Sequence, residues 1–193
     1  MNVVVVGAGA AAIAGPVVLT LARRTSSLDY APGPCDVAAT TTVAGLMVTL
    51  VLARTPAEFA MLLPVIVLAG AAAVVDAREG RLPDMLTGPL LVGSLIAVLL
   101  AGHSLVGVAA AVALLLVLKM TAAAAVGWGD VKLLPSLIAV LTVQGAVLAG
   151  IVLMALLVAL TAVLIGLSPG RRSTLVPYGP ALVVGALVAA VGF

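Results

Sequence analysis

The sequence predicts an all-α fold, a polytopic transmembrane bundle of about eight helices (six to eight), and three observations predict it. Of the 193 residues, 64% are hydrophobic and only 8% are charged, with a mean hydropathy of +1.40, whereas soluble domains carry about 25% charge. The apolar residues form long continuous runs, which is typical of membrane helices and not of alternating barrel strands. In lipid, a spanning chain must satisfy its own backbone hydrogen bonds. A water-soluble globular fold is therefore excluded.

The N-terminal part is expected to form two helices, over residues 3–22 and 37–53. The first run lacks a basic leader and ends in Arg23-Arg24 without a small-residue cleavage site, so we expect a retained anchor and not a signal peptide. A polar loop with prolines, residues 25–36, separates the two runs.

The third run, residues 59–75, stops at the most charged segment of the chain, DAREGRLPD at 76–84. Five further apolar runs follow it, at residues 85–101, 105–126, 133–143, 146–167 and 175–193. The run from Leu133 is shorter than a spanning helix, and Gln144-Gly145 after it is either a turn or a kink. We expect one membrane-embedded domain over 1–193, with two helices in 1–58 and the chemistry in 59–193.

The basic residues predict the orientation of this bundle. If all eight apolar runs cross the membrane, eight of the nine basic residues lie on one side and only Arg54 lies on the other. The eight are Arg23, Arg24, Arg78, Arg81, Lys119, Lys132, Arg171 and Arg172. Basic loops stay in the cytoplasm, so both termini are expected outside. Spread over loops, these residues form no stripe for nucleic acid and are interpreted as topology signals. Arg171 and Arg172 are also expected to contact the headgroups of membrane lipids.

Two of the seven acidic residues follow long apolar runs: Asp76, and Asp130 within GWGDVK at 127–132. The helix pair between them returns the chain to the same side, so both carboxylates are expected at one depth on the cytoplasmic face. A close pair of acids shares a proton and titrates as a unit, which suits an aspartyl protease. The simpler interpretation is that both are solvated loop charges.

Three segments resemble the type IV prepilin leader peptidases, membrane aspartyl proteases with a GxGD motif. GWGDVKLLPSL is similar to their GxGDxKL segment, DAREGRLPDMLTGPLL to the segment around the first aspartate, and VPYGPALVVGAL to the C-terminal Pro-aromatic-Gly-Pro segment. The three occur in the family's order, and the resemblance covers residues 59–193.

The resemblance implies that Asp76 and Asp130 are the catalytic pair and that the substrates are prepilin-like proteins, cut after a glycine that ends their basic leader. It implies supporting roles for nine further residues: Pro83, Asp84, Gly127, Gly129, Lys132, Pro177, Tyr178, Gly179 and Pro180. No cofactor is expected.

The sequence departs from many bacterial members near its N-terminus. Those members carry a cytoplasmic insertion with two CxxC pairs that bind zinc, and they also methylate the new N-terminus. Here the corresponding loop contains the only cysteine, Cys35, too few ligands for such a site. We therefore expect a short, peptidase-only member in which methyltransferase activity is doubtful.

Two other functions remain open from the sequence. A small ion- or proton-coupled transporter would use the two acids as relays near the bilayer midplane. An inactive assembly factor for a pilus or a secretion system would keep the fold without the chemistry. The sequence leaves the particular pilin or pseudopilin and the oligomeric state undetermined.

Overall fold

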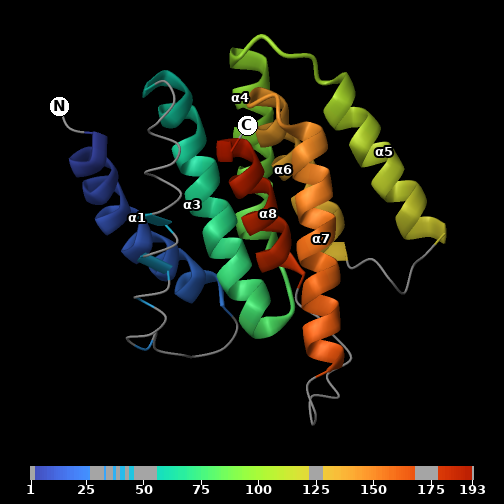
Figure 1. Ribbon diagram of the computed structural model, residues 1–193, viewed down its shortest axis with the longest axis horizontal. Helices are drawn as coiled ribbons and strands as arrows, with labels where there is room; N and C mark the ends of the chain where they lie inside the picture. The colour runs from blue at the N-terminus through green and yellow to red at the C-terminus, as the bar shows by residue number, and fades with distance from the viewer. Residues whose placement is uncertain are drawn as a thin grey trace.

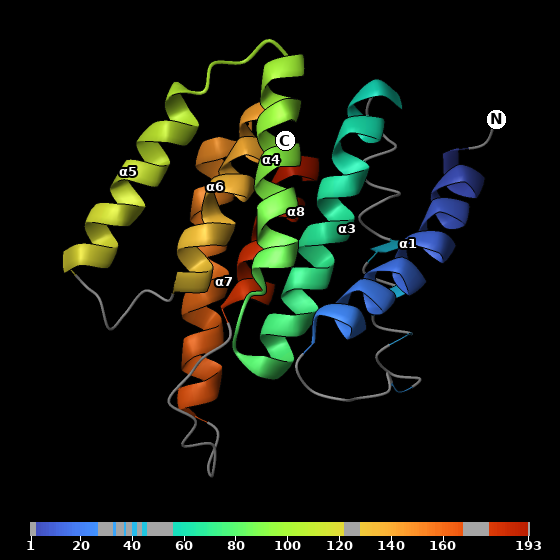
Figure 2. The same ribbon diagram turned by 180° about the vertical axis from the view of Figure 1, so that it is seen from behind.

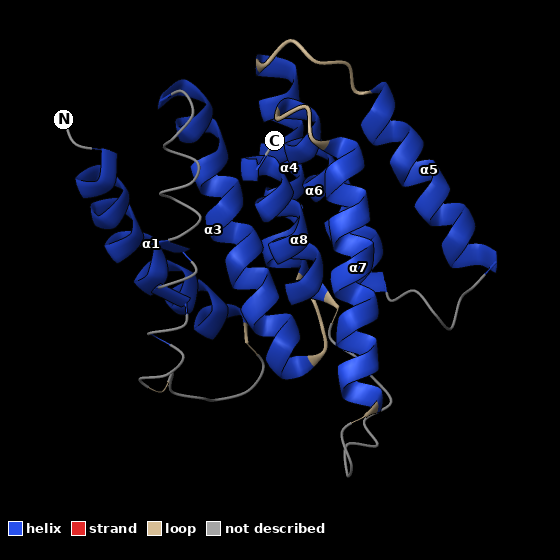
Figure 3. Ribbon diagram, in the orientation of Figure 1, coloured by secondary structure: helices blue, strands red, loops and turns tan. Residues whose placement is uncertain are grey.

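The computed structural model describes residues 3–26, 33, 37, 40, 41, 44, 45, 56–121, 128–167 and 178–192. In this part of the chain the fold is all-α, with seven helices and no strand (Figure 3). The helices are α1 (Val3–Thr25), α3 (Pro56–Glu79), α4 (Asp84–Leu100), α5 (Val106–Thr121), α6 (Trp128–Val143), α7 (Val147–Gly166) and α8 (Gly179–Gly192).

Successive helices from α3 to α8 run in opposite directions (Figure 1). Helices α3, α4, α6 and α8 form the centre of the bundle, α1 packs on the outer side of α3, and α7 packs on α8. Helix α5 leans away from the others, as the opposite view also shows (Figure 2). Because of this alternation, the last turns of α1, α3 and α5 lie at the same end of the bundle as the first turns of α4, α6 and α8.

That end carries all the basic side chains that the structure describes, and we call it the charged end: Arg23, Arg24, Arg78, Arg81, Lys119 and Lys132. His103 lies in the loop between α4 and α5, at the opposite end (Figure 1). The segregation of charge expected from the sequence is therefore present in the described part of the chain; Arg54, Arg171 and Arg172 lie outside it.

The core lies between α3, α4, α6 and α8 and is almost wholly aliphatic. Leu86, Leu90, Leu133 and Leu137 are fully or almost fully buried there. Close helix contact also depends on small residues, as membrane helix packing does in general. A Cβ atom on Gly185 of α8 would lie 2.8 Å from the Cα atom of Met154 in α7.

The structure extends or divides several of the predicted elements. Helix α3 continues past Val75 to Glu79, so Asp76 is helical. Helix α6 begins at Trp128 and is 16 residues long. Gln144 and Gly145 form a turn, with Gly145 at φ 69°, that reverses the chain into α7. The kink alternative is therefore wrong. Most of the run expected at 37–53 lies outside the described residues.

One described helix is clearly long and apolar enough to cross a membrane. This is α7, over Val147–Leu164, of which only 11% is buried within the bundle. Three apolar segments are shorter: Asp84–Leu100, Val131–Val143 and Gly179–Ala190. Apart from the side that packs on α8, most of the surface of α7 is thus made of exposed aliphatic side chains.

Candidate active site

Asp76 lies in the last turn of α3, at the charged end of the bundle. It is only 7% exposed, and its Oδ2 atom accepts a hydrogen bond from the backbone N–H of Gly179, 2.8 Å away. The helix ends at Glu79, and the following Gly80 has φ 62° and donates its N–H to the carbonyl of Asp76. Asp76 is therefore not a solvated loop charge.

Gly179 begins α8 and packs directly on the Asp76 side chain. A Cβ atom at position 179 would lie 2.6 Å from Asp76 Oδ2 and 3.0 Å from its Cβ and Cγ atoms. Only glycine lets the backbone come close enough to donate this hydrogen bond without a clash. The first and third motifs, 103 residues apart, thus meet in one contact.

Asp130 lies in the first turn of α6, where the helix dipole favours a negative charge. Its backbone is at the charged end with Asp76, while its side chain lies outside the described structure, as does Gly127. The loop after Asp76 packs on this helix start. A Cβ atom on Gly129 would lie 2.9 Å from Leu82 Cδ1. Gly129 therefore allows the Asp76 segment and the start of α6 to approach closely.

A second link joins the same two segments. The Lys132 ammonium of α6 forms an ion pair with the Asp84 carboxylate in the first turn of α4. Pro83 precedes α4 and adopts the extended conformation of an N-cap residue. Opposite charges at the starts of two helices that run the same way are the sequence signal that could have predicted this pair.

Glu79 is a site residue that the sequence analysis did not single out. Its side chain is only 3% exposed, forms an ion pair with Arg81 and accepts a hydrogen bond from the Ser26 hydroxyl. It thus joins the end of α1 to the loop that carries Leu82. The sequence signal that could have predicted this ion pair is the opposite charge of Arg81, two residues after Glu79 in a short loop.

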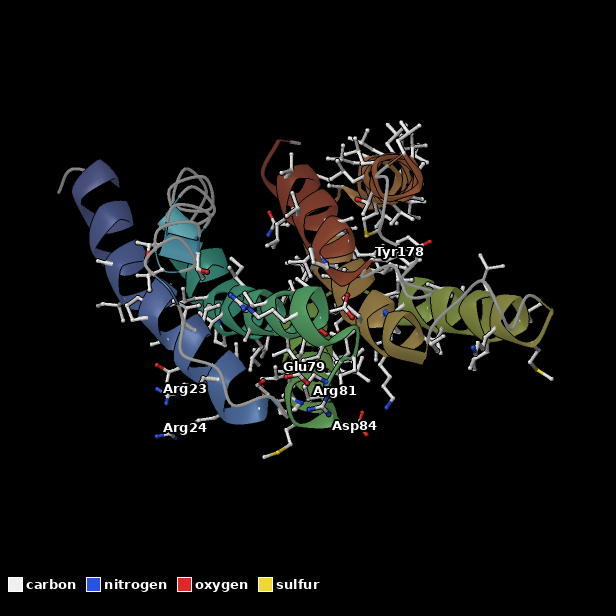
Figure 4. The ribbon with its side chains drawn as sticks, turned by 90° about the horizontal axis from the view of Figure 1, so that it is seen from below. Arg23, Arg24, Glu79, Arg81, Asp84 and Tyr178 are labelled. Carbon is white, nitrogen blue, oxygen red and sulfur yellow. The ribbon has the colours of Figure 1, made fainter. Side chains whose placement is uncertain are left out.

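Seen from the charged end, Glu79, Arg81 and Asp84 lie together at the α3–α4 loop (Figure 4). Arg23 and Arg24 lie to one side of them at the end of α1, and Tyr178 lies by the start of α8. Tyr178 is half-buried and packs against the core. Pro180 is in the first turn of α8, and Pro177 lies outside the described residues.

The described part of this site is a buried carboxylate with one oxygen fixed by a backbone amide, at the same end of the bundle as a helix start that carries a second aspartate. Such a carboxylate can accept or hold a proton for an acid–base reaction. Within the described ranges no three potential metal ligands gather at one place.

The comparisons with known proteins identify the family. The model of the type IV leader peptidase family matches residues 61–168, which is more than half of the chain and includes Asp76, Asp84, Asp130 and Lys132. No curated protein and no solved structure gave a significant match. Members of this family are typically membrane-bound. By this match the chain belongs to the type IV leader peptidase family, and its general role is that of a prepilin-type peptidase.

Proposed function

We propose that this protein is a multi-pass membrane aspartyl endopeptidase that removes the basic leader of prepilin-like proteins at the cytoplasmic face, with Asp76 and Asp130 as its catalytic pair. The observation that carries the proposal is the buried Asp76 carboxylate, held by Gly179 at the end of the bundle where α6 begins. The family match supports the class of reaction.

The proposed chemistry needs one ionised and one protonated carboxyl group. The ionised aspartate removes a proton from water, and the resulting hydroxide attacks the scissile carbonyl, which the protonated aspartate polarises. The protonated group then donates its proton to the leaving amine, so the pair returns to a state with one proton. No cofactor takes part.

The proposed orientation follows from the charged end. Basic residues flank cytoplasmic ends of membrane helices, and all those that the structure describes lie at the same end of the bundle as the proposed site. In this proposal the leader and the attacking water are on the cytosolic side and the N-terminus is outside. The substrate's apolar helix would remain in the bilayer beside these helices, and lipids would cover the exposed aliphatic surface of α7.

A transporter fits these observations less well. Relay carboxylates are expected near the bilayer midplane, lining a path through the bundle, whereas Asp76 is in the last turn of α3. An inactive assembly factor would have no need of a glycine packed against this carboxylate.

The direct test is cleavage of a co-expressed prepilin, scored by loss of the leader. Asp76→Ala and Asp130→Ala should each abolish cleavage at normal expression levels. Asp84→Asn should keep substantial activity, because the Asp84 side chain is exposed and its ion-pair partner in the described part of the chain is Lys132. Full cleavage by either alanine variant would refute the pair. Complete loss in Asp84→Asn alone would move the first catalytic position to Asp84.

A further inference from the structure

An apolar groove lies along α3 between α8 and the N-terminal segment. It encloses about 190 Å³ and has uncharged lining residues throughout. Helix α3 lines it with five residues, of which Gly70 and Ala73 are small and Ile66, Val67 and Val74 are larger aliphatics. Helix α8 contributes a stripe that includes Pro180, Val184 and Leu187. Helix α1 and the described residues Thr40 and Ala44 form the other side.

The groove begins beside the proposed catalytic carboxylate. Ala73 and Val74 lie three and two residues before Asp76 in α3, and Pro180 follows Gly179, whose N–H is bonded to Asp76. From there the α8 wall continues to Leu187, a length of about 10 Å at the helical rise of 1.5 Å per residue. An occupant that fills the groove would therefore extend about two helical turns away from Asp76.

We propose that this groove binds the first two turns of the substrate's apolar helix, immediately after the cleaved bond. The proposal rests on the proposed function, since it needs a peptide bond at Asp76. Its chemistry fits an aliphatic helix, because the lining from α3 and α8 is uncharged and apolar and its small members, Gly70 and Ala73, allow close helix approach. The volume is enough for about one aromatic or two small aliphatic side chains, since a cavity of 150 Å³ holds benzene.

Continuity with Asp76 is what favours a substrate over a lipid chain. A lipid chain would cover any exposed aliphatic face, and α7 offers a larger exposed face than the groove. The contact between Gly185 of α8 and Met154 of α7 shows that this face lies at a similar depth to the groove. The groove differs because its lining begins within one helical turn of Asp76 and runs along the two helices that hold this carboxylate. A substrate cut at Asp76 places its next residues here.

The test compares two valines at similar depth, Val184 in the groove and Val152 on α7 outside it, which are 37% and 51% exposed. In a Cys35→Ser background, Val184→Cys and Val152→Cys are each paired in native membranes with single cysteines in the first two turns of a co-expressed prepilin helix. Disulfide capture should occur at Val184→Cys and not at Val152→Cys. Equal capture at both positions, or capture only at Val152→Cys, would overturn the proposal. Absence of capture at both would overturn it when KM for the Val184→Trp variant is also unchanged.

A kinetic measurement covers the case in which cysteine geometry prevents capture. Val184→Trp should raise KM for the prepilin about tenfold, the loss expected when one buried aliphatic side chain is excluded, and Val152→Trp should not. An unchanged KM for Val184→Trp would overturn the proposal. Leader cleavage by the Cys35→Ser chain tests the proposed function separately. Disulfide capture without leader cleavage would refute the peptidase function and not substrate binding in the groove. Leader cleavage with neither capture nor a change in KM would refute substrate binding in the groove and not the peptidase function.

Discussion

Replacing Gly179 by alanine should damage the site while changing only one methyl group. The new Cβ atom would lie 2.6 Å from Asp76 Oδ2 and 3.0 Å from two further atoms of the same side chain. Asp76 is buried and cannot swing into solvent, so either the carboxylate or the start of α8 must move. In both cases the 2.8 Å hydrogen bond from Gly179 is lost or lengthened.

The size of the effect follows from that hydrogen bond. Hydrogen bonds to charged groups contribute about 1.5–3 kcal/mol, and each 1.36 kcal/mol of activation free energy is tenfold in rate. If the bond holds Asp76 in its reactive position, kcat for leader cleavage should fall about ten- to hundredfold. Overpacking at this contact should also lower the free energy of unfolding by about 1–3 kcal/mol.

The assay is single-turnover leader cleavage by the purified protein in lipid vesicles, with thermal unfolding measured in parallel. Gly107→Ala is the matched control, because that helical glycine has no atom within 4 Å of a new Cβ. It should leave the rate unchanged and the stability equal or slightly raised. A wild-type cleavage rate in Gly179→Ala would refute the proposed role of this contact in positioning Asp76.

Three other substitutions test the surrounding contacts. Gly129→Ala puts a methyl group 2.9 Å from Leu82 Cδ1, the end of a flexible side chain, so leader cleavage should slow by less than in Gly179→Ala; an equal or larger loss would contradict this ranking. Asp84→Lys and Lys132→Asp should each reduce leader cleavage, by a small factor because an exposed ion pair contributes about 0.2–1 kcal/mol. The double exchange restores opposite charges and should recover part of the lost cleavage. No recovery in the cleavage assay would exclude the ion pair as the cause. Leu137→Ala should lower the free energy of unfolding by about 2–5 kcal/mol in denaturant titration, because this side chain is fully buried, and a loss below 1 kcal/mol would indicate that it packs loosely.

The sequence predicted the helical class and most element positions because continuous apolar runs are a strong local signal. The ends of the elements were less predictable. Helix α3 passes through Asp76 and continues to Glu79 because charged residues are compatible with a helix once it reaches the end of its apolar stretch. The turn at Gly145 could not be told from a kink, since only the packing of α7 against α8 requires the chain to reverse there.

The candidate site was predictable as a set of residues and not as a set of contacts. Asp76 and Asp130 stood out because acids are rare in this chain. The hydrogen bond from Gly179 joins residues 103 positions apart, and the burial of Asp76 depends on where α8 packs. Neither follows from local patterns. The same is true of Glu79, whose partner Ser26 directly follows α1 and lies outside the family match.

The central claim, that Asp76 and Asp130 act as one catalytic unit, is tested most directly by the cleavage rates of Asp76→Asn, Asp130→Asn and the double variant. Residues that act as a unit show strongly non-additive losses. The account predicts that each single variant loses leader cleavage almost completely and that the double variant is no worse than either. Near-normal cleavage by one single variant, or losses that multiply in the double variant, would contradict it.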